Sequence, residues 1–343
     1  MNRLFDDDGI WVKAALHCHS TVSDGSLSPE GVVKFYAERG YKVISVTDHN
    51  VVTVLKKKFE GLLTVPGIEL SIGKGRGGSS YHLVVLGLEE VSRPEVSNIN
   101  ELNSFLAEIE DRGGVSFIAH PYWSNLFSED LYQLSNYVGI EVYNTGCDVE
   151  VAKGFSMVHW DQLLSLGKKV WGIAVDDAHG YFFPPIDADY GWTWIKLKDL
   201  EERELLEALK QGFFYSSMGP QVFEFNIEDN LLHMQLSPVT RVNIVSKNGK
   251  GFSISVATLM RIVSAWCSKS GDIRKVVDDV QIERFNDRVK LLITRGESWL
   301  RAFIKNSSIV GLTLKGLRFD DYFRVEVIDP RNRYAWLNPL FLG

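Results

Sequence analysis

The sequence predicts an α/β fold in its first two thirds and a smaller, mostly-β domain after it. Short apolar runs alternate with stretches of helical periodicity over residues 1–220, and most of these runs end in His, Asp or Glu. Over residues 221–343 the helical spacing fades and strand-like runs follow one another closely. Strands that alternate with helices form α/β sheets or barrels, whose functional side chains gather at the strand carboxyl ends. We therefore expect a barrel-like α/β domain and then a small β-sandwich-like domain.

Seven apolar runs are the predicted strands of the first domain. They cover residues 10–16, 43–50, 62–69, 81–86, 115–121, 139–144 and 170–179. Four segments have apolar residues at helical spacing, and these cover residues 28–39, 99–109, 159–166 and 200–209. The first of them begins with Ser28-Pro29-Glu30, which is an N-cap followed by proline at the first helical position, and Gly40 ends it.

The second domain is predicted from seven further apolar runs. They cover residues 222–227, 231–236, 242–245, 252–256, 289–293, 299–304 and 322–327. Asn248-Gly249 is a favourable hairpin turn between two of them. Residues 257–266 fit a strand or a helix equally well. The sequence contains no internal repeat and no low-complexity segment.

Nine potential metal ligands cluster at the ends of the predicted strands in the first 180 residues. The set contains six of the eight histidines and three carboxylates: His17, His19, Asp24, His49, Glu69, His82, His120, Asp177 and His179. Imidazole and carboxylate groups suit zinc and similar divalent ions. Any one of these residues has an ordinary structural explanation, but their joint placement at strand ends indicates a multinuclear metal site.

The His17-Cys18-His19 segment is the most informative part of this set. Side chains alternate along a strand, so the two histidines share a face and Cys18 points away from it. Two ordinary polar histidines would give the same pattern, and Asp24 alone would fit a turn residue in Ser23-Asp24-Gly25. Cys18 is therefore expected in the core, and no G-x-S-x-G motif is present, so covalent catalysis is not supported.

The order and spacing of these residues resemble the PHP (polymerase and histidinol phosphatase) superfamily over roughly residues 10–220. The resemblance rests on the nine residues above and on the segments Thr47-Asp48-His49-Asn50, Ala119-His120-Pro121 and Asp177-Ala178-His179. Residues 324–339 further resemble the ending of a stand-alone PHP group that includes carbamate and aryl-ester hydrolases. The resemblance implies a distorted (β/α)7 barrel with two or three divalent metal ions, for which zinc, manganese and iron are all suitable.

The resemblance also implies how the ligands are shared. One metal would be held by His17, His19, Glu69 and Asp177; a second by Glu69, His82 and His120; and a third by Asp24, His49 and His179. Glu69, Asp177 and His179 would be the catalytic members. Several family members have a histidine where this chain has Asp24. The neighbouring acids Asp48 and Asp176 would either orient imidazoles or act as turn acids.

Three functions fit such a site. A metal-bridging hydroxide could hydrolyse a small phosphate ester or nucleotide, or it could attack a carbamate, amide or ester. A metal-binding module without catalysis is the third reading, and the complete ligand set argues against it. A phosphoesterase would need Lys or Arg near the metals, and Lys74 and Arg76 in the glycine-rich segment 73–78 are the candidates. A mobile surface loop is the alternative for this segment.

The aromatic residues after His120 and His179 are the remaining candidates. Tyr122, Trp123 and Asn125 follow His120, and Tyr181, Phe182 and Phe183 follow His179. The aromatic side chains would form substrate-pocket walls or pack between the two domains. An apolar pocket of this kind would suit a carbonyl hydrolase.

Composition limits the remaining possibilities. The 343 residues can bury a sizeable core, and no apolar run approaches the roughly 18 residues of a membrane span. The acidic start does not resemble a signal peptide, and three widely spaced cysteines indicate no disulfide framework, so a cytoplasmic location is expected. Residues 221–343 carry 18 Lys and Arg against 13 Asp and Glu, and the preceding part carries 19 against 31. We expect a small anionic substrate, and no membrane or nucleic-acid polymer as partner.

Overall fold

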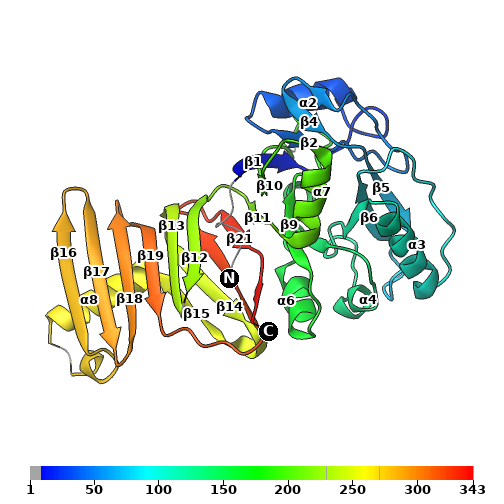
Figure 1. The fold of residues 1–343 in the computed structure, drawn as a ribbon. Coiled ribbons are helices and arrows are strands. Elements are labelled where there is room, and N and C mark those ends of the chain that lie inside the picture. The colour runs from blue at the N-terminus through cyan, green and yellow to red at the C-terminus, as the bar shows by residue number, and fades with distance from the viewer. Residues whose placement is uncertain (1–8, 185, 229, 270, 343) are drawn as a thin grey trace. The chain divides into compact units, whose positions relative to one another are not determined.

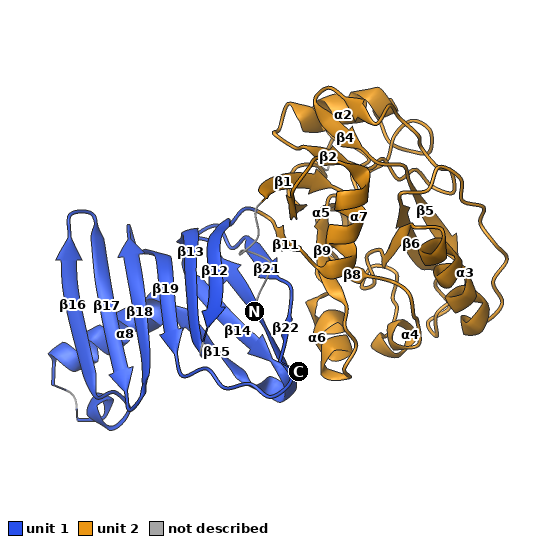
Figure 2. Cartoon of the chain, viewed as in Figure 1, with its two compact units in different colours: residues 1–7, 219–343 blue, residues 8–218 orange. Residues whose placement is uncertain are grey.

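The computed structural model describes residues 9–184, 186–228, 230–269 and 271–342, and the chain divides into two compact units (Figures 1 and 2). Unit 2 covers residues 8–218 and contains all nine candidate ligands, whereas unit 1 takes in residues 219–343. The predicted mixed α/β character is confirmed. Among the described residues, no helix is both long and apolar enough to cross a bilayer.

The strands of unit 2 belong to two sheets. In one, the order is β11 (Phe214–Ser217), β10 (Trp192–Leu197), β1 (Ile10–Ala15), β2 (Val43–Ile44), β4 (Leu62–Thr64) and β3 (Lys58–Phe59). In the other, the order is β5 (Gly67–Ile72), β6 (Tyr81–Leu86), β7 (Val115–Ile118), β8 (Gly139–Asn144) and β9 (Trp171–Val175). The last three of these strands are parallel, but β6 runs antiparallel to both of its neighbours.

The helices of unit 2 cover these sheets. They are α2 (Pro29–Ala37), α3 (Ile99–Asp111), α4 (Ser128–Tyr132), α5 (Thr145–Val151), α6 (Met157–Ser165) and α7 (Glu202–Gln211). The four predicted helices correspond to α2, α3, α6 and α7, whereas α4 and α5 are too short to show a helical period in the sequence. Ser28 caps α2 as predicted, because its side chain accepts a hydrogen bond from the Gly31 amide at 3.2 Å.

The closed (β/α)7 barrel is not confirmed, because the described strands of unit 2 belong to two sheets in place of one closed ring. Two isolated parallel bridges join these sheets instead, between Cys18 and Ala178 and between His49 and Glu69. Both bridges lie in segments that carry candidate ligands. The candidate ligands therefore lie where the two sheets meet.

The predicted strand 62–69 is wrong as a single element. It divides at Pro66, which has no amide hydrogen to donate to a ladder, and its halves are β4 and β5 of different sheets. Glu69 therefore lies within β5 and not at a strand end. Similarly, only Val43 and Ile44 of the predicted strand 43–50 join a ladder, and the rest approaches the site as irregular chain.

Two apolar clusters hold the ligand-bearing segments in place. Val12, Ala14 and Leu16 pack in one cluster with residues of β7, β9 and α7. Ala15 and Cys18 pack in the other, against the inner face of α2. Strand β1 is thus buried on both sides, as is usual for a central strand of an α/β domain.

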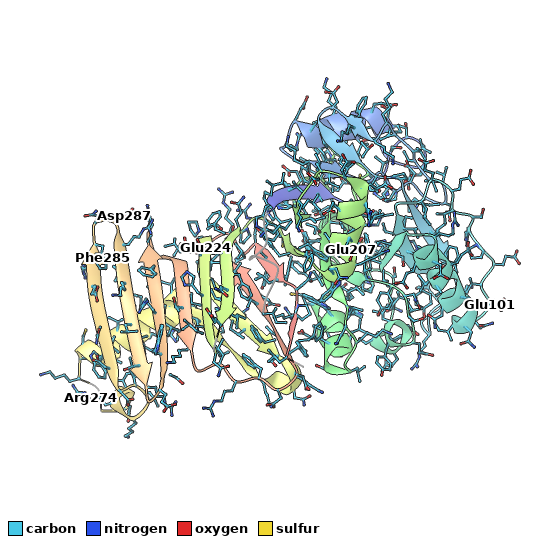
Figure 3. All side chains as sticks on the ribbon, in the orientation of Figure 1. Glu101, Glu207, Glu224, Arg274, Phe285 and Asp287 are labelled. Atoms are coloured by element: carbon cyan, nitrogen blue, oxygen red, sulfur yellow. The ribbon has the colours of Figure 1, made fainter. Side chains whose placement is uncertain are left out.

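Unit 1 is mostly β, in agreement with the sequence. One antiparallel sheet has the order β12 (Val222–Glu228), β13 (Leu231–Val239), β19 (Ser308–Lys315), β18 (Ser298–Lys305), β17 (Arg288–Arg295) and β16 (Asp279–Phe285). The other strands are β14 (Arg241–Ser246), β15 (Gly251–Ser255), β20 (Tyr322–Ile328), β21 (Tyr334–Leu337) and β22 (Leu340–Phe341). Figure 3 labels Phe285 and Asp287 at the turn between β16 and β17.

The ambiguous segment 257–266 of unit 1 is helical. It forms α8 (Val256–Cys267), which begins at Ser255 because this side chain accepts a hydrogen bond from the Thr258 amide. Short 3-10 turns, η1 (Lys247–Gly249) and η2 (Ile273–Lys275), complete the unit. The sequence patterns did not predict β16, β19, β21 and β22 of this unit, nor β3, β10 and β11 of unit 2.

Gly67→Ala should destabilise the protein, because Gly67 starts β5 in close contact with the chain that follows β2. An added Cβ would overlap Ser45 Oγ and lie 2.8 Å from Thr47 Cγ2. Overpacking of this kind costs roughly 1–3 kcal/mol of unfolding free energy, measurable by equilibrium denaturation. Gly31→Ala in α2 is the control: its Cβ would meet only ordinary contacts at 3.4 Å, and alanine favours a helix. Equal stability of both variants would contradict this packing.

Candidate metal centre

The fold brings the nine predicted ligands together from both sheets of unit 2. Their ligand atoms form three groups, and within each group all atoms lie within 4.8 Å of one another. The first group is His17, His19, Glu69 and Asp177. The second group is Glu69, His82 and His120. The third group is Asp24, His49 and His179, joined by His19, which the resemblance assigns only to the first metal.

Glu69 is shared between groups because its two oxygens face different imidazoles. Its Oε1 lies 2.8 Å from His82 Nδ1 and 3.1 Å from His120 Nε2. Its Oε2 lies 3.4 Å from both His17 Nε2 and His19 Nε2. The same oxygen lies 2.9 Å from His49 Nδ1. One carboxylate therefore serves the first and second groups with separate atoms.

Asp177 closes the first group from the other side. Its Oδ1 lies 3.2 Å from His17 Nε2 and 3.0 Å from His19 Nε2. The backbone of Asp177 has a positive φ of 55°, and that of His120 has a φ of 26°. Residues other than glycine adopt such values at a cost, and the surrounding structure must hold them there. Backbone strain at two candidate ligands is typical of a functional site.

The third group is open to solvent, unlike the first. Asp24 Oδ2 lies 3.5 Å from His49 Nε2, and Asp24 Oδ1 lies 3.5 Å from His179 Nε2. The Asp24 side chain is 55% exposed, and those of His49 and His179 are 32% and 31% exposed. The side chains of His17 and His19 are fully buried. A molecule from solution therefore meets the third group before the first.

The electrostatics of the buried groups favour a bound cation. Burial raises the pKa of Glu69, but the charge of His17 and the nearby imidazoles of His120 and His49 outweigh this effect and hold the pKa well below its usual range. The pKa of Asp177 is lowered in the same way, against burial, by His17 and His19. Burial lowers the pKa of His19, which favours the neutral imidazole that binds metals.

The pKa of His17 shows that the surrounding carboxylates favour a positive charge at this position. Burial disfavours its charged form, yet the carboxylates of Asp177, Glu141 and Glu69 raise its pKa well above the ordinary value. A proton or a divalent cation can supply the positive charge between these carboxylates.

Two buried oxygens test whether the residues fit a metal. Glu69 Oε2 and Asp177 Oδ1 are buried and have no hydrogen-bond partner among the described residues. An unsatisfied buried carboxylate oxygen is costly, and a cation would satisfy both. The distances that join His17 Nε2 and His19 Nε2 to each other and to Glu69 Oε2 and Asp177 Oδ1 run from 3.0 to 3.4 Å. Tetrahedral ligands at zinc–ligand distances lie about 3.3 Å apart, so the first group fits.

A buried layer behind the ligands was missed by the sequence analysis. Glu141 Oε1 lies 2.6 Å from His17 Nδ1, and its Oε2 accepts hydrogen bonds from the His120 amide at 2.7 Å and from Asn144 Nδ2 at 2.8 Å. Asn144 also donates to Asp177 Oδ2 at 3.0 Å. The sequence did contain a signal for this layer: Glu141 is a carboxylate within the predicted apolar strand 139–144. A buried acid needs hydrogen-bonding partners, so this residue could have been recognised as part of a polar site.

Asp48 and Asp176 accept hydrogen bonds from loop residues. They therefore act as turn acids, which was one of the two roles expected for them. Asp48 accepts hydrogen bonds from the Ser20 amide and hydroxyl, both at 2.7 Å, and from Thr53. Asp176 accepts from the amides of residues 189, 190 and 191 and from Tyr36. Asp187 fixes the His179 segment, whose amide donates to it at 2.6 Å.

Cys18 lies in the core, as predicted. Its thiol donates a hydrogen bond to the Ser45 carbonyl at 3.3 Å, and burial raises its pKa well above the ordinary value. The side chain is therefore a protonated core residue and not a nucleophile.

Lys74 and Arg76 lie on a different cavity from the metal ligands. This cavity of about 920 Å³ is lined by Lys74, Arg76, Arg93 and Tyr81, among others, and by none of the nine ligands. Tyr81 and His82 are neighbours in β6, so their side chains point to opposite faces. Arg76 also lies against Asp130, with its Nε 3.6 Å from Oδ1. Substrate contact by Lys74 or Arg76 stays a prediction.

The aromatic residues near the site divide into two kinds. Tyr181 is buried and donates a hydrogen bond to the His19 carbonyl at 2.7 Å, and Phe182 packs against Phe35 at a ring distance of 5.1 Å. Trp123 is 41% exposed and lies against the rings of His82 and His120. Of Tyr181, Phe182 and Trp123, only Trp123 is both exposed to solvent and in contact with the rings of candidate ligands.

Sequence comparison gives partial matches. No family model matches the chain. A phosphoribosyl 1,2-cyclic phosphate 1,2-diphosphodiesterase from Eggerthella lenta is 38% identical over 80 residues, which are 22% of this chain and 30% of that protein. A 5'-3' exoribonuclease from Haemophilus influenzae is 31% identical over 102 residues, which are 28% and 36%. The chain therefore spans about a third of the length of each curated relative.

Structure comparison shows likenesses to solved structures at low sequence identity. A two-domain protein from Bacteroides vulgatus, described as containing a predicted PHP-like metal-dependent phosphoesterase, has a TM-score of 0.47 and 15% identity, over 97% of this chain and 96% of that one. An amidohydrolase from Chromobacterium violaceum has a TM-score of 0.40 and 16% identity, over 57% and 96%.

Glu141→Gln should weaken metal binding without unfolding the protein. The amide keeps a hydrogen-bonding oxygen but removes the charge that raises the basicity of His17. Loss of such a partner typically costs 10- to 100-fold in metal affinity, measurable by competition with a chromophoric chelator. Glu150→Gln, at an exposed position in α5, should leave the affinity unchanged. Equal affinities for the two variants would rule out this role of Glu141.

Proposed function

We propose, from the premise that the chain resembles the PHP superfamily, that it is a metal-dependent phosphoesterase acting on a small phosphate ester or nucleotide. The observation that carries the proposal is Glu69, whose two oxygens face two separate imidazole groups at 2.8–3.4 Å. A buried carboxylate in this position suits the bridge between two cations. The reaction is assigned to residues 1–220, and no role in it is assigned to residues 221–343.

The buried and the exposed candidate ligands would hold different ions. His17, His19, Glu69 and Asp177 hold the buried part of the site, and Glu141 fixes the orientation of His17. Glu69, His82 and His120 would hold a second ion, and Asp24, His49 and His179 a third. Zinc, manganese and iron all suit this mixture of nitrogen and oxygen donors.

Bound divalent ions would supply acidified water and polarisation of the phosphoryl group. The polypeptide then has three tasks: to hold the ions, to orient the substrate at the open side, and to keep competing nucleophiles away. Cys18 is turned into the core, which agrees with a reaction that needs no protein nucleophile. The open side is formed by Asp24, His49 and His179.

The names of the curated relatives support a phosphate ester as substrate. One is named a phosphodiesterase and the other an exoribonuclease, although each match covers only part of that protein. The net charge of the substrate would be offset by the cations themselves. Such a substrate therefore does not require Lys74 or Arg76.

A carbonyl hydrolase is the second candidate, and two observations favour it. Among the described residues, the ion pairs of the third group contain no Lys or Arg that would bind a phosphate. The exposed indole of Trp123 beside the second group would suit an apolar carbamate, amide or ester.

A substrate screen of the metal-loaded protein separates these candidates. We expect faster turnover of aryl phosphates or phosphodiesters than of aryl esters and carbamates, and competitive inhibition by inorganic phosphate. Phosphate should bind because its oxygens are hard anionic ligands for the cations. Preferred cleavage of esters, with no inhibition by phosphate, would replace the phosphoesterase proposal with the carbonyl hydrolase.

Glu69→Gln tests the bridging role. The wild-type protein should carry two or three transition-metal ions per chain by elemental analysis. Glu69→Gln removes a charge that two ions would share, so it should lose at least one ion and at least roughly 100-fold in turnover, equivalent to about 2.7 kcal/mol. Glu129→Gln, at an exposed position of α4, is the matched control. Full metal content and normal turnover in Glu69→Gln would exclude a bridge.

A further inference from the structure

The second group of candidate ligands is exposed to solvent through one of its members. The side chains of Glu69 and His120 are 1% and 4% exposed, so a substrate cannot approach across them. His82 is the most exposed member of the second group, at 18%. Direct approach from solvent to the second group, as distinct from approach through the exposed third group, therefore passes beside His82.

Trp123 lies beside this entrance. Its ring centroid is 5.8 Å from that of His82 and 5.0 Å from that of His120, with interplanar angles of 69° and 73°. Part of the indole faces solvent, because the residue is 41% exposed. The aromatic ring thus contacts two candidate ligands and still offers a free apolar surface.

The backbone holds Trp123 in a defined position. The turn that follows His120 is closed by hydrogen bonds from the Ser124 amide to the His120 carbonyl at 3.0 Å and from the Leu126 amide to the Pro121 carbonyl at 3.0 Å. Ser124 Oγ also lies 3.0 Å from His120 Nδ1. The turn that carries the indole is therefore anchored to a candidate ligand, which limits the entropy that stacking would cost.

We propose that Trp123 determines substrate specificity by stacking on a planar aromatic group, an aryl or nucleobase ring, attached to the scissile ester. This inference rests on the proposed function, because the ester must lie at the cations beside Trp123. A flat aromatic ring that covers the exposed part of the indole buries apolar area and gains aromatic packing. Stacking of a ring on an aromatic side chain changes affinity by about 5- to 150-fold.

The test compares phenylphosphonate with methylphosphonate, which share the anionic group and are not hydrolysed. Their binding to the metal-loaded protein is measured by calorimetry, with metal content determined for each variant. Wild type should bind phenylphosphonate at least about fivefold more tightly than methylphosphonate. Trp123→Ala should lose this preference and keep its affinity for methylphosphonate, and Trp123→Phe should retain most of it.

Tyr132→Ala is the matched control. Tyr132 is an exposed aromatic residue of α4, 45% exposed, whose ring lies 5.5 Å from Lys168 Nζ. This variant should keep the full preference for phenylphosphonate.

The possible failures are distinguishable. Equal binding of the two phosphonates by wild type, or an unchanged preference in Trp123→Ala, would overturn the role of Trp123 and leave the phosphoesterase proposal standing. A parallel loss of methylphosphonate affinity and metal in Trp123→Ala would show that the indole supports the ligands, which also overturns the inference. If neither phosphonate binds to the metal-loaded wild type, the proposed function fails and the inference fails with it.

Discussion

The burial of the Glu69 carboxylate is the constraint on which the rest of the site depends. Taking an ionised carboxylate out of water is expensive unless charges and hydrogen bonds compensate for it. Five imidazoles surround Glu69, each with a nitrogen within 3.4 Å of one of its oxygens. They come from segments after β1, β2 and β7 and from β6, so satisfying this one charge brings together distant parts of the chain.

Glu69 also links the two sheets through its backbone. Its carbonyl accepts a hydrogen bond from the Asn50 amide at 2.8 Å, and its amide donates to the Asp48 carbonyl at 3.3 Å. A second link, from the His19 amide to the Ala178 carbonyl at 2.9 Å, lies on the other side of the site. The main chain therefore positions the ligands together with the side chains. The bond to the Ala178 carbonyl lies next to Asp177, whose φ is positive.

Exposure changes across the site in a way that suits hydrolysis. The carboxylates of the first group are buried and ionised, so they are suited to hold a cation firmly. Asp24 and its two histidines face solvent, where a substrate anion can arrive and leave. Glu141 and Asn144 occupy the far side of the first group and leave no path for substrate there. A rigid interior and an open face are thus combined within one cluster.

The sequence by itself determined the α/β character, the four longer helices and the identities of all nine residues that gather at the site. These features depend on local periodicity and on rare polar residues at the ends of apolar runs, which can be recognised without a fold. The short helices α4 and α5 carry no such signal. The division of 62–69 at Pro66 could have been suspected, but the assignment of its halves to different sheets could not.

Only the tertiary structure decided the relations between these residues. It showed that His19 lies near two groups and that Glu141 and Asn144 stand behind the ligands. It also placed Lys74 and Arg76 on a separate cavity, and Trp123 beside His82. Each of these facts depends on which segments far apart in the chain become neighbours. Local propensity does not encode that choice, because it arises from the joint burial of apolar surface and the compensation of buried charge.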